Sequence, residues 1–188
     1  SSLTGTAERA IRTTATGLAP ETAYEGRLIA TNDRGADTSA TTAFTTPPVG
    51  VAVTGGGYDG LSRGFQPTPG ESRQPVGVVR LTPAAPGATL TGLTVAFDDA
   101  MGVARVALWR SDDNAFTPSA DTALARVDLD PSTSLASTLS FDDVQTALPA
   151  QSRHLFVTVT LTDAAEGRVT GTLASESALS VRGGTIDR

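Results

Sequence analysis

The chain has 188 residues, enough for one or two domains, with no cysteine, a single histidine (His154) and a net charge of −6. These counts exclude disulfides, thiolate metal sites and multi-histidine metal sites. All 14 basic residues are arginine and acidic residues outnumber them, so we expect no nucleic-acid partner, and no stretch approaches the ~18 apolar residues that insertion into a membrane needs.

Short alternating runs of Thr, Val and Ala extend through the chain, and Gly, Pro, Asp and Ser interrupt them about every 8–12 residues. This pattern is typical of an all-β sandwich and predicts two units, residues 1–46 and residues 51–188. The best candidate for a helix is Phe141–Leu148, which Pro149 limits to two turns at most.

The first unit is predicted to contain strands at Arg9–Thr16, Ala23–Asn32 and Ser39–Thr45. In the middle strand the alternation of side chains places Tyr24, Leu28 and Ala30 on one face. Residues 47–50 follow as a linker, because Pro47 and Pro48 cannot donate backbone hydrogen bonds and stiffen the chain.

Three motifs of the first unit occur in a known order. An L-x-P-x-T-x-Y corner ends at Tyr24, the strand Y-x-x-R-L-x-A-x-N-x-x-G continues from it, and an F-T-T strand starts at Phe44. Residues 18–46 therefore resemble the second half of a fibronectin type III domain. A whole domain has about 100 residues and a core tryptophan upstream, so the resemblance implies an incomplete first sandwich within a longer protein. Tyr24, Leu28 and Phe44 are then candidates for contact with whatever completes it.

The second unit is predicted to contain strands at Val51–Thr54, Val76–Leu81, Thr89–Asp98, Val103–Arg110, Thr122–Asp128, Ser134–Phe141, His154–Leu161, Arg168–Ser175 and Leu179–Gly183. We expect seven or eight strands around one core, as in an immunoglobulin-like sandwich. The residues predicted to face inward are Leu93, Val95, Phe97, Ala104, Val106, Leu108, Leu155, Val157, Val159 and Leu161.

Four short motifs of this unit also occur together elsewhere: L-T-G-L-T-V from Leu90, V-A-L-W-R-S from Val106, L-F-V-T-V-T-L from Leu155 and G-G-T from Gly183. They resemble a β-sandwich repeat of secreted and cell-surface proteins of the Bacteroidota, often found beside fibronectin type III domains. The resemblance implies a bacterial protein that is secreted or displayed on the cell surface.

Two strings match catalytic or cofactor motifs without the structure that their chemistry needs. Residues 55–60 fit G-x-G-x-x-G, yet the sequence after them, with Pro67 and Pro69, cannot form the helix that would hold a pyrophosphate. Residues 60–64 fit G-x-S-x-G, with Ser62 as nucleophile and His154 as base, yet no strand–turn–helix arrangement surrounds them. We therefore expect no enzymatic activity and no organic cofactor.

Residues 111–114, together with Asp121, offer oxygen ligands of the kind that calcium prefers. Calcium takes about six to eight oxygens, and the segment lacks the central glycine and terminal glutamate of an EF-hand loop. The alternative is a solvated hairpin loop in which the carboxylates cap turns, and the sequence favours this interpretation.

Trp109 is out of phase with Val106 and Leu108, so we expect its side chain to face away from the core. There it could stack against a sugar, dock a neighbouring domain or subunit, pack against Arg105, or pack under a loop. The hypothesis that accounts for all these features is a non-catalytic extracellular module that serves as a spacer, adhesion or assembly domain. Its partners would be flanking domains of the same polypeptide. One alternative is a fibre or surface-lattice subunit completed by strand addition from a neighbour, and another is a carbohydrate-binding module of a secreted hydrolase.

Overall fold

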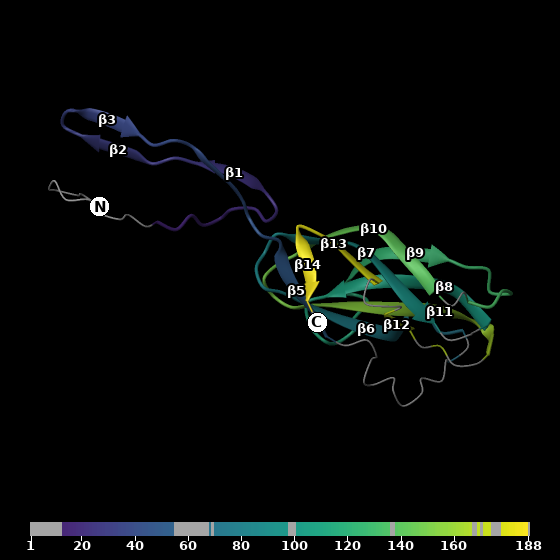
Figure 1. Ribbon diagram of the computed structural model, residues 1–188. Helices are drawn as coiled ribbons and strands as arrows, with labels where there is room; N and C mark the ends of the chain where they lie inside the picture. Colours follow the sequence, from purple (N-terminus) through teal and green to yellow (C-terminus); the bar gives the residue numbers. More distant parts are fainter. Residues whose placement is uncertain are drawn as a thin grey trace. The chain divides into compact units, whose positions relative to one another are not determined.

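The computed structural model describes residues 13–54, 68, 70–97, 101–135, 138–166, 169, 171–173 and 178–187. These residues form β-strands and loops, and among them no helix is long and apolar enough to cross a membrane. The prediction of an all-β sandwich is confirmed. The chain divides into two compact units, Ser1–Thr46 and Pro47–Arg188 (Figure 1).

The described part of the first unit is a two-stranded ribbon. Its strands are β1 (Ala23–Gly26), β2 (Ile29–Asn32), β3 (Gly35–Thr38) and β4 (Thr42–Thr45). β1 pairs with β4 and β2 with β3, both antiparallel, and the turn between β2 and β3 is closed by a hydrogen bond from Arg34 N to Asn32 Oδ1 (2.8 Å). No residue of 13–46 is buried, so the ribbon has no core of its own.

The ribbon is interrupted where one continuous strand was predicted. The predicted strand Ala23–Asn32 divides at Arg27 and Leu28, because these two residues stand opposite the three residues 39–41 of the returning chain. Such a bulge ends regular pairing on both sides of it. Residues 13–16, predicted as the end of an earlier strand, are not in a strand, and residues 9–12 lie outside the described residues.

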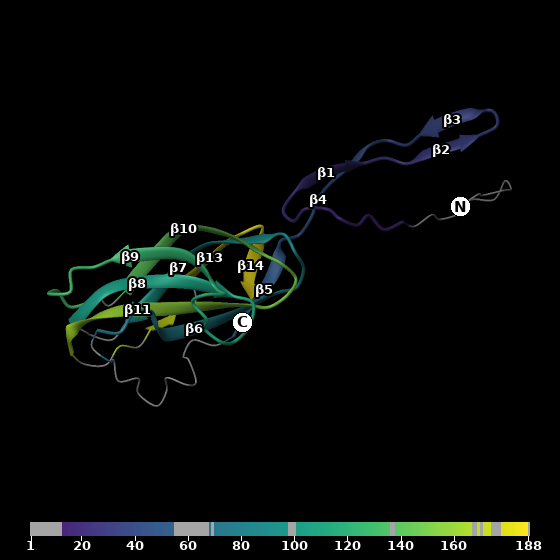
Figure 2. The same cartoon turned by 180° about the vertical axis from the view of Figure 1, so that it is seen from behind.

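The second unit consists of β5 (Val49–Thr54), β6 (Gln74–Pro83), β7 (Ala88–Phe97), β8 (Met101–Ser111), β9 (Thr122–Asp128), β10 (Thr138–Leu148), β11 (Arg153–Glu166), β12 (Gly171–Leu173), β13 (Leu179–Arg182) and β14 (Gly184–Asp187). A six-stranded sheet has the order β14-β5-β6-β11-β8-β9. In the smaller sheet β10 pairs with one edge of β7, while β12 and β13 share its other edge. Figures 1 and 2 show the two sheets as separate layers.

The core of the second unit lies between these sheets. All the residues predicted to face inward are buried except Ala104, which is only partly buried. The reason is the period of two along each strand, which sends every second side chain into the space between the layers. Phe141, Leu81 and Leu148, which were not among the predicted inward residues, complete this core.

The helix predicted at Phe141–Leu148 is wrong, because these residues belong to β10. Residues 141–148 lie within this strand, and all of them except 143–145 pair with β7. Three residues of β10 stand opposite one of β7 in a bulge, where Asp143 and Gln145 have positive φ angles of 59° and 44°. The bulge brings Phe141 and Val144, three positions apart, to the same buried side. The bulge therefore gives the strand an apolar spacing that a helix would also have.

The linker predicted at 47–50 is shorter in the structure. β5 starts at Val49, whose side chain is buried in the core and whose N–H donates to the carbonyl of Gly183 (3.1 Å). Gly50 pairs with Thr185 of β14, in the only parallel strand pair found among the described residues. The burial of Val49 and the pairing of Gly50 place both residues in β5. The linker is therefore limited to Pro47 and Pro48, and the strand starts directly after Pro48, which cannot donate a ladder hydrogen bond.

Candidate functional site

Trp109 lies on the outer face of the six-stranded sheet, the side that its phase in β8 predicts. Its strand partner across β11 is Phe156, whose side chain is fully buried on the same outer face. Phe116, from the loop between β8 and β9, covers both: its ring lies 5.5 Å from the Trp109 ring, edge on, and 5.6 Å from the Phe156 ring. The loop therefore anchors an aromatic cluster outside the main core.

The indole of Trp109 is held in one orientation. Its Nε1–H donates to Thr158 Oγ1 of β11 (3.0 Å), and the guanidinium carbon of Arg73 lies 5.7 Å from the ring centroid. Arg73 has a left-handed backbone (φ 58°), and its N–H donates to Thr160 Oγ1 (3.4 Å). Two neighbouring threonines of one strand thus fix both the tryptophan and the backbone of the arginine next to it.

A groove of about 540 Å³ opens beside this pair on the same face of the sheet. We call it the outer groove. It is lined by Ser72, Arg73, Arg105, Ala107, Trp109, Ala123, Leu124, Ala125, Arg126, Thr158 and Thr160. Three of these are arginines and none is acidic. Arg105 donates to Asp128 beside the groove, and this hydrogen bond lowers the pKa of the Asp128 carboxyl. The groove therefore keeps an excess of positive charge.

Of the three arginines of the outer groove, only Arg105 was expected beside Trp109, and Arg73 and Arg126 were missed. Arg105 and Trp109 are four positions apart in β8, which a strand places on one face. Arg126 is opposite Ala107 in β9, and Arg73 lies just before β6. The spacing within β8 was a usable signal, whereas the register with β9 and the position of Arg73 come only from the folded sheet.

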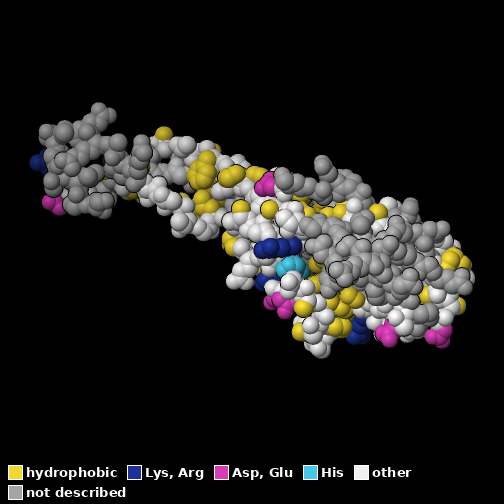
Figure 3. All heavy atoms as spheres, turned by 90° about the horizontal axis from the view of Figure 1, so that it is seen from below, with side chains coloured by type: hydrophobic (Ala, Val, Ile, Leu, Met, Phe, Trp, Pro, Cys, Tyr) yellow, Lys and Arg dark blue, Asp and Glu magenta, His cyan; other side chains and the backbone are white. Residues whose placement is uncertain are grey.

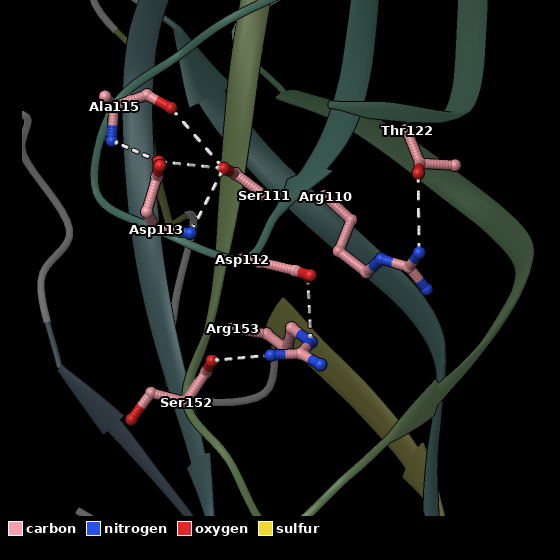
Figure 4. Close-up of polar contacts among 8 residues, drawn as sticks. All are labelled: Arg110, Ser111, Asp112, Asp113, Ala115, Thr122, Ser152 and Arg153. Carbon is pink, nitrogen blue, oxygen red and sulfur yellow. Dashed lines mark hydrogen bonds and ion pairs between the residues drawn. The ribbon is translucent and has the colours of Figure 1, made fainter. Parts of the chain in front are cut away.

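In the loop that was considered for calcium, Asp113 and Asp121 cap turns of the loop itself, while Asp112 pairs with Arg153 at the start of β11; Figure 4 shows the contacts of Asp113 and Asp112. Asp113 Oδ1 accepts hydrogen bonds from Ala115 N (2.9 Å) and Ser111 Oγ (3.2 Å), and Asp121 Oδ2 accepts one from Thr117 N (2.7 Å). In the described part of the chain no three acidic or histidine side chains gather as a metal site would require. These contacts favour the interpretation as turn caps.

A second hollow, of about 430 Å³, lies where β8 and β10 end and β7 and β11 begin. Arg110 and Arg153 line it, but so does Asp112, which pairs with Arg153 (Nε to Oδ1, 3.3 Å) (Figure 4). Arg110 donates to Thr122 Oγ1 (3.3 Å), while its buried Nε has no hydrogen-bond partner among the described residues. The carboxylate inside this hollow makes it a weaker site for an anion than the outer groove.

His154 lies in β11 between Arg80 of β6 and Ser111 of β8, and its Nδ1 is buried without a hydrogen-bond partner among the described residues. Figure 3 shows the histidine among basic and acidic side chains on the face seen from below. Partial burial and the charge of Arg80 lower the pKa of His154 below its ordinary value of 6.5, and Asp113 opposes this effect.

This shift predicts a pH dependence of stability. Because the folded chain binds the proton less readily than the unfolded chain, the free energy of unfolding should be highest above pH 6.5 and fall as the pH drops through the lowered pKa. Urea unfolding followed by Trp109 fluorescence between about pH 7.5 and 5.5 would measure the decline. His154→Gln, which does not titrate, should flatten it over this window. An equal decline in the variant would contradict the assignment.

The three candidate residues of the first unit are on the ribbon. Tyr24 stacks on Phe44, its partner across β1 and β4, with ring centroids 5.9 Å apart, and its hydroxyl accepts a hydrogen bond from Ala19 N (2.9 Å). Phe44 is 45% exposed and Leu28 is 51% exposed. Ile29, which the sequence analysis did not single out, is 55% exposed. The ribbon therefore carries apolar side chains that nothing in its described part covers.

The two strings considered for catalysis, residues 55–60 and 60–64, lie outside the described residues. Comparison of the chain with models of known protein families and with curated proteins finds no match.

Proposed function

We propose that this chain is a non-catalytic structural and interaction module of a larger bacterial protein that is secreted or displayed on the cell surface. In this proposal the second unit is a self-sufficient sandwich, and the first unit is one half of a sandwich that another β-sheet completes. That sheet belongs to a flanking part of the same polypeptide. The observation that carries the proposal is the exposed apolar surface of the ribbon, at Leu28, Ile29 and Phe44.

The ribbon lacks the support that a stable sheet needs. An isolated two-stranded hairpin is marginally stable at best in water, and a third strand or a packed layer is needed for independent stability. Here no residue of 13–46 is buried, and in the described residues β1 pairs only with β4 and β2 only with β3. The unit would therefore gain most of its stability from whatever covers its apolar side chains.

The corner at Tyr24 supports the kind of partner proposed. Immunoglobulin-like sandwiches commonly contain a tyrosine at this corner whose hydroxyl bonds to the backbone a few residues upstream. Tyr24 makes this contact with Ala19 N (2.9 Å). Thr46 Oγ1 donates to the carbonyl of Ala19 (2.6 Å), which ties the corner to the returning strand. These contacts support the proposal that the ribbon is one part of a sandwich.

Hydrogen–deuterium exchange on the whole chain tests the proposal. At low protein concentration the amides of β1–β4 should exchange at rates close to those of unprotected peptides, because local opening of the ribbon costs little free energy. The amides of β6, β8 and β11 in the same sample are the control and should be strongly protected, since these strands surround the core of the second unit.

Two outcomes would count against this proposal. Protection of β1–β4 that rises with protein concentration, with a matching increase in mass by light scattering, would favour the alternative of a fibre or lattice subunit completed by a neighbour. Strong protection of β1–β4 in a monomer would show that the first unit is stable alone and would contradict both versions.

A further inference from the structure

We propose that the outer groove binds an acidic sugar, a pyranose ring that carries a carboxylate, as part of an acidic polysaccharide. The site lies wholly in the second unit, so this proposal does not depend on what completes the ribbon. Its volume of about 540 Å³ lies within the range of small-molecule sites, about 300–1,000 Å³.

The charge of the groove selects an anion. Its lining holds Arg73, Arg105 and Arg126 and no acidic residue. Of the ion pairs found among the described residues, only that of Arg105 with Asp128 involves one of the three. The guanidinium of Arg73 lies over the Trp109 ring, and the charge of Arg126 helps to lower the pKa of Asp128, so the three arginines together outweigh this one carboxylate. The whole chain carries a charge of −6, but salt screens charges more than ~10 Å apart. The arginines of the groove, and not the net charge of the chain, therefore determine which charge a ligand must carry.

The shape of the groove favours a sugar ring over a peptide. It lies on the outer face of the sheet, where the small side chains of Ala107 and Ala123 leave room beside the indole of Trp109. An extended peptide would instead add to a free strand edge through main-chain hydrogen bonds. A pyranose ring presents C–H groups to an aromatic ring and hydroxyls to Thr160, while a planar guanidinium binds a carboxylate with two hydrogen bonds.

The groove is also arranged before any ligand arrives. Thr158 accepts a hydrogen bond from the indole of Trp109, and Thr160 accepts one from the backbone N–H of Arg73. Arg73 has a left-handed backbone and lies beside the indole ring. A residue other than glycine adopts such a backbone at a cost in free energy, and such residues cluster at binding sites. Little ordering is then required on binding, which favours affinity.

Fluorescence titration of the whole chain provides a direct test, because Trp109 is its only tryptophan. Oligogalacturonate should change the emission of Trp109 in a saturable way and should release or absorb heat in calorimetry with the same midpoint. Its methyl ester has the same rings without the negative charge and should bind at least about tenfold more weakly. Added salt should weaken the binding of oligogalacturonate.

Substitutions locate the site. Arg126→Gln and Arg73→Gln should each weaken oligogalacturonate binding about tenfold. Arg182→Gln is the matched control, because it removes the same charge from an exposed residue of β13 in the smaller sheet and should leave the affinity unchanged. Circular dichroism verifies that each variant is folded.

Four results would overturn the proposal: no binding of oligogalacturonate, equal binding of its methyl ester, equal weakening in Arg182→Gln, or equally tight binding of poly-glutamate. The last would show that the groove serves an acidic peptide instead.

Discussion

Replacing Phe141 with alanine should lower the free energy of unfolding of the second unit by about 3–5 kcal/mol. Phe141 is 2% exposed in β10, opposite Leu93 of β7, and it is among the largest fully buried side chains of the core. Its removal would leave a cavity between two sheets that cannot close around it, because both are tied by strand pairing. Urea unfolding followed by Trp109 fluorescence would measure the loss.

Phe44→Ala is the matched control for this prediction. It makes the same chemical change in β4 of the ribbon, where the side chain is 45% exposed and no core surrounds it. The unfolding transition reported by Trp109 should therefore stay where it is in the unchanged chain. If the two variants destabilised that transition equally, the division into a unit with a core and a ribbon without one would be wrong.

Replacing Gly102 with alanine should destabilise the second unit by more than about 2 kcal/mol, through backbone strain and overpacking together. Gly102 has a φ of +78°, and a Cβ at this position would clash with the backbone of Ala165 at its Cα and N. Four residues of β11, 162–165, stand opposite Gly102, and this bulge brings the two backbones together. Because the clash is with backbone, no side-chain rotation can relieve it.

Gly92→Ala separates this effect from the ordinary consequences of removing a glycine. Gly92 also lies inside a strand, β7, but its φ is not positive and the nearest atom to a built Cβ is the carbonyl oxygen of Phe141 at 3.3 Å. A shift of a few tenths of an ångström would accommodate the methyl group. Thermal or urea unfolding should therefore show a much smaller loss for Gly92→Ala, and equal losses would contradict the explanation for Gly102.

The sequence predicted the inward residues of β7 and β11 correctly because they recur at every second position. Leu93, Val95 and Phe97 recur every second residue, as do the four residues from Leu155 to Leu161, and all are buried. β9 was predicted at its observed bounds, Thr122–Asp128, since Asp121 and Pro131 stand close to its ends and interrupt the alternation. Local pattern alone was sufficient for these elements.

Prediction from alternation failed where a strand contains a bulge. The extra residues in β10 changed the spacing of Phe141 and Val144 from two to three, so the segment suggested a helix. In the ribbon, residues 39–41 stand opposite only Arg27 and Leu28, and this bulge divides a strand that was predicted to be continuous. A bulge depends on which strand pairs with which and in what register, and a single strand's sequence does not contain that information.

The sequence by itself determined that the chain is all-β and that Trp109 faces away from the core. These are properties of short segments with a period of two. Only the tertiary structure decided that Arg73, Arg105 and Arg126 meet around Trp109, since they come from three separate segments. Their proximity follows from the order β6-β11-β8-β9 in the sheet and from the threonines of β11, which position both Trp109 and Arg73.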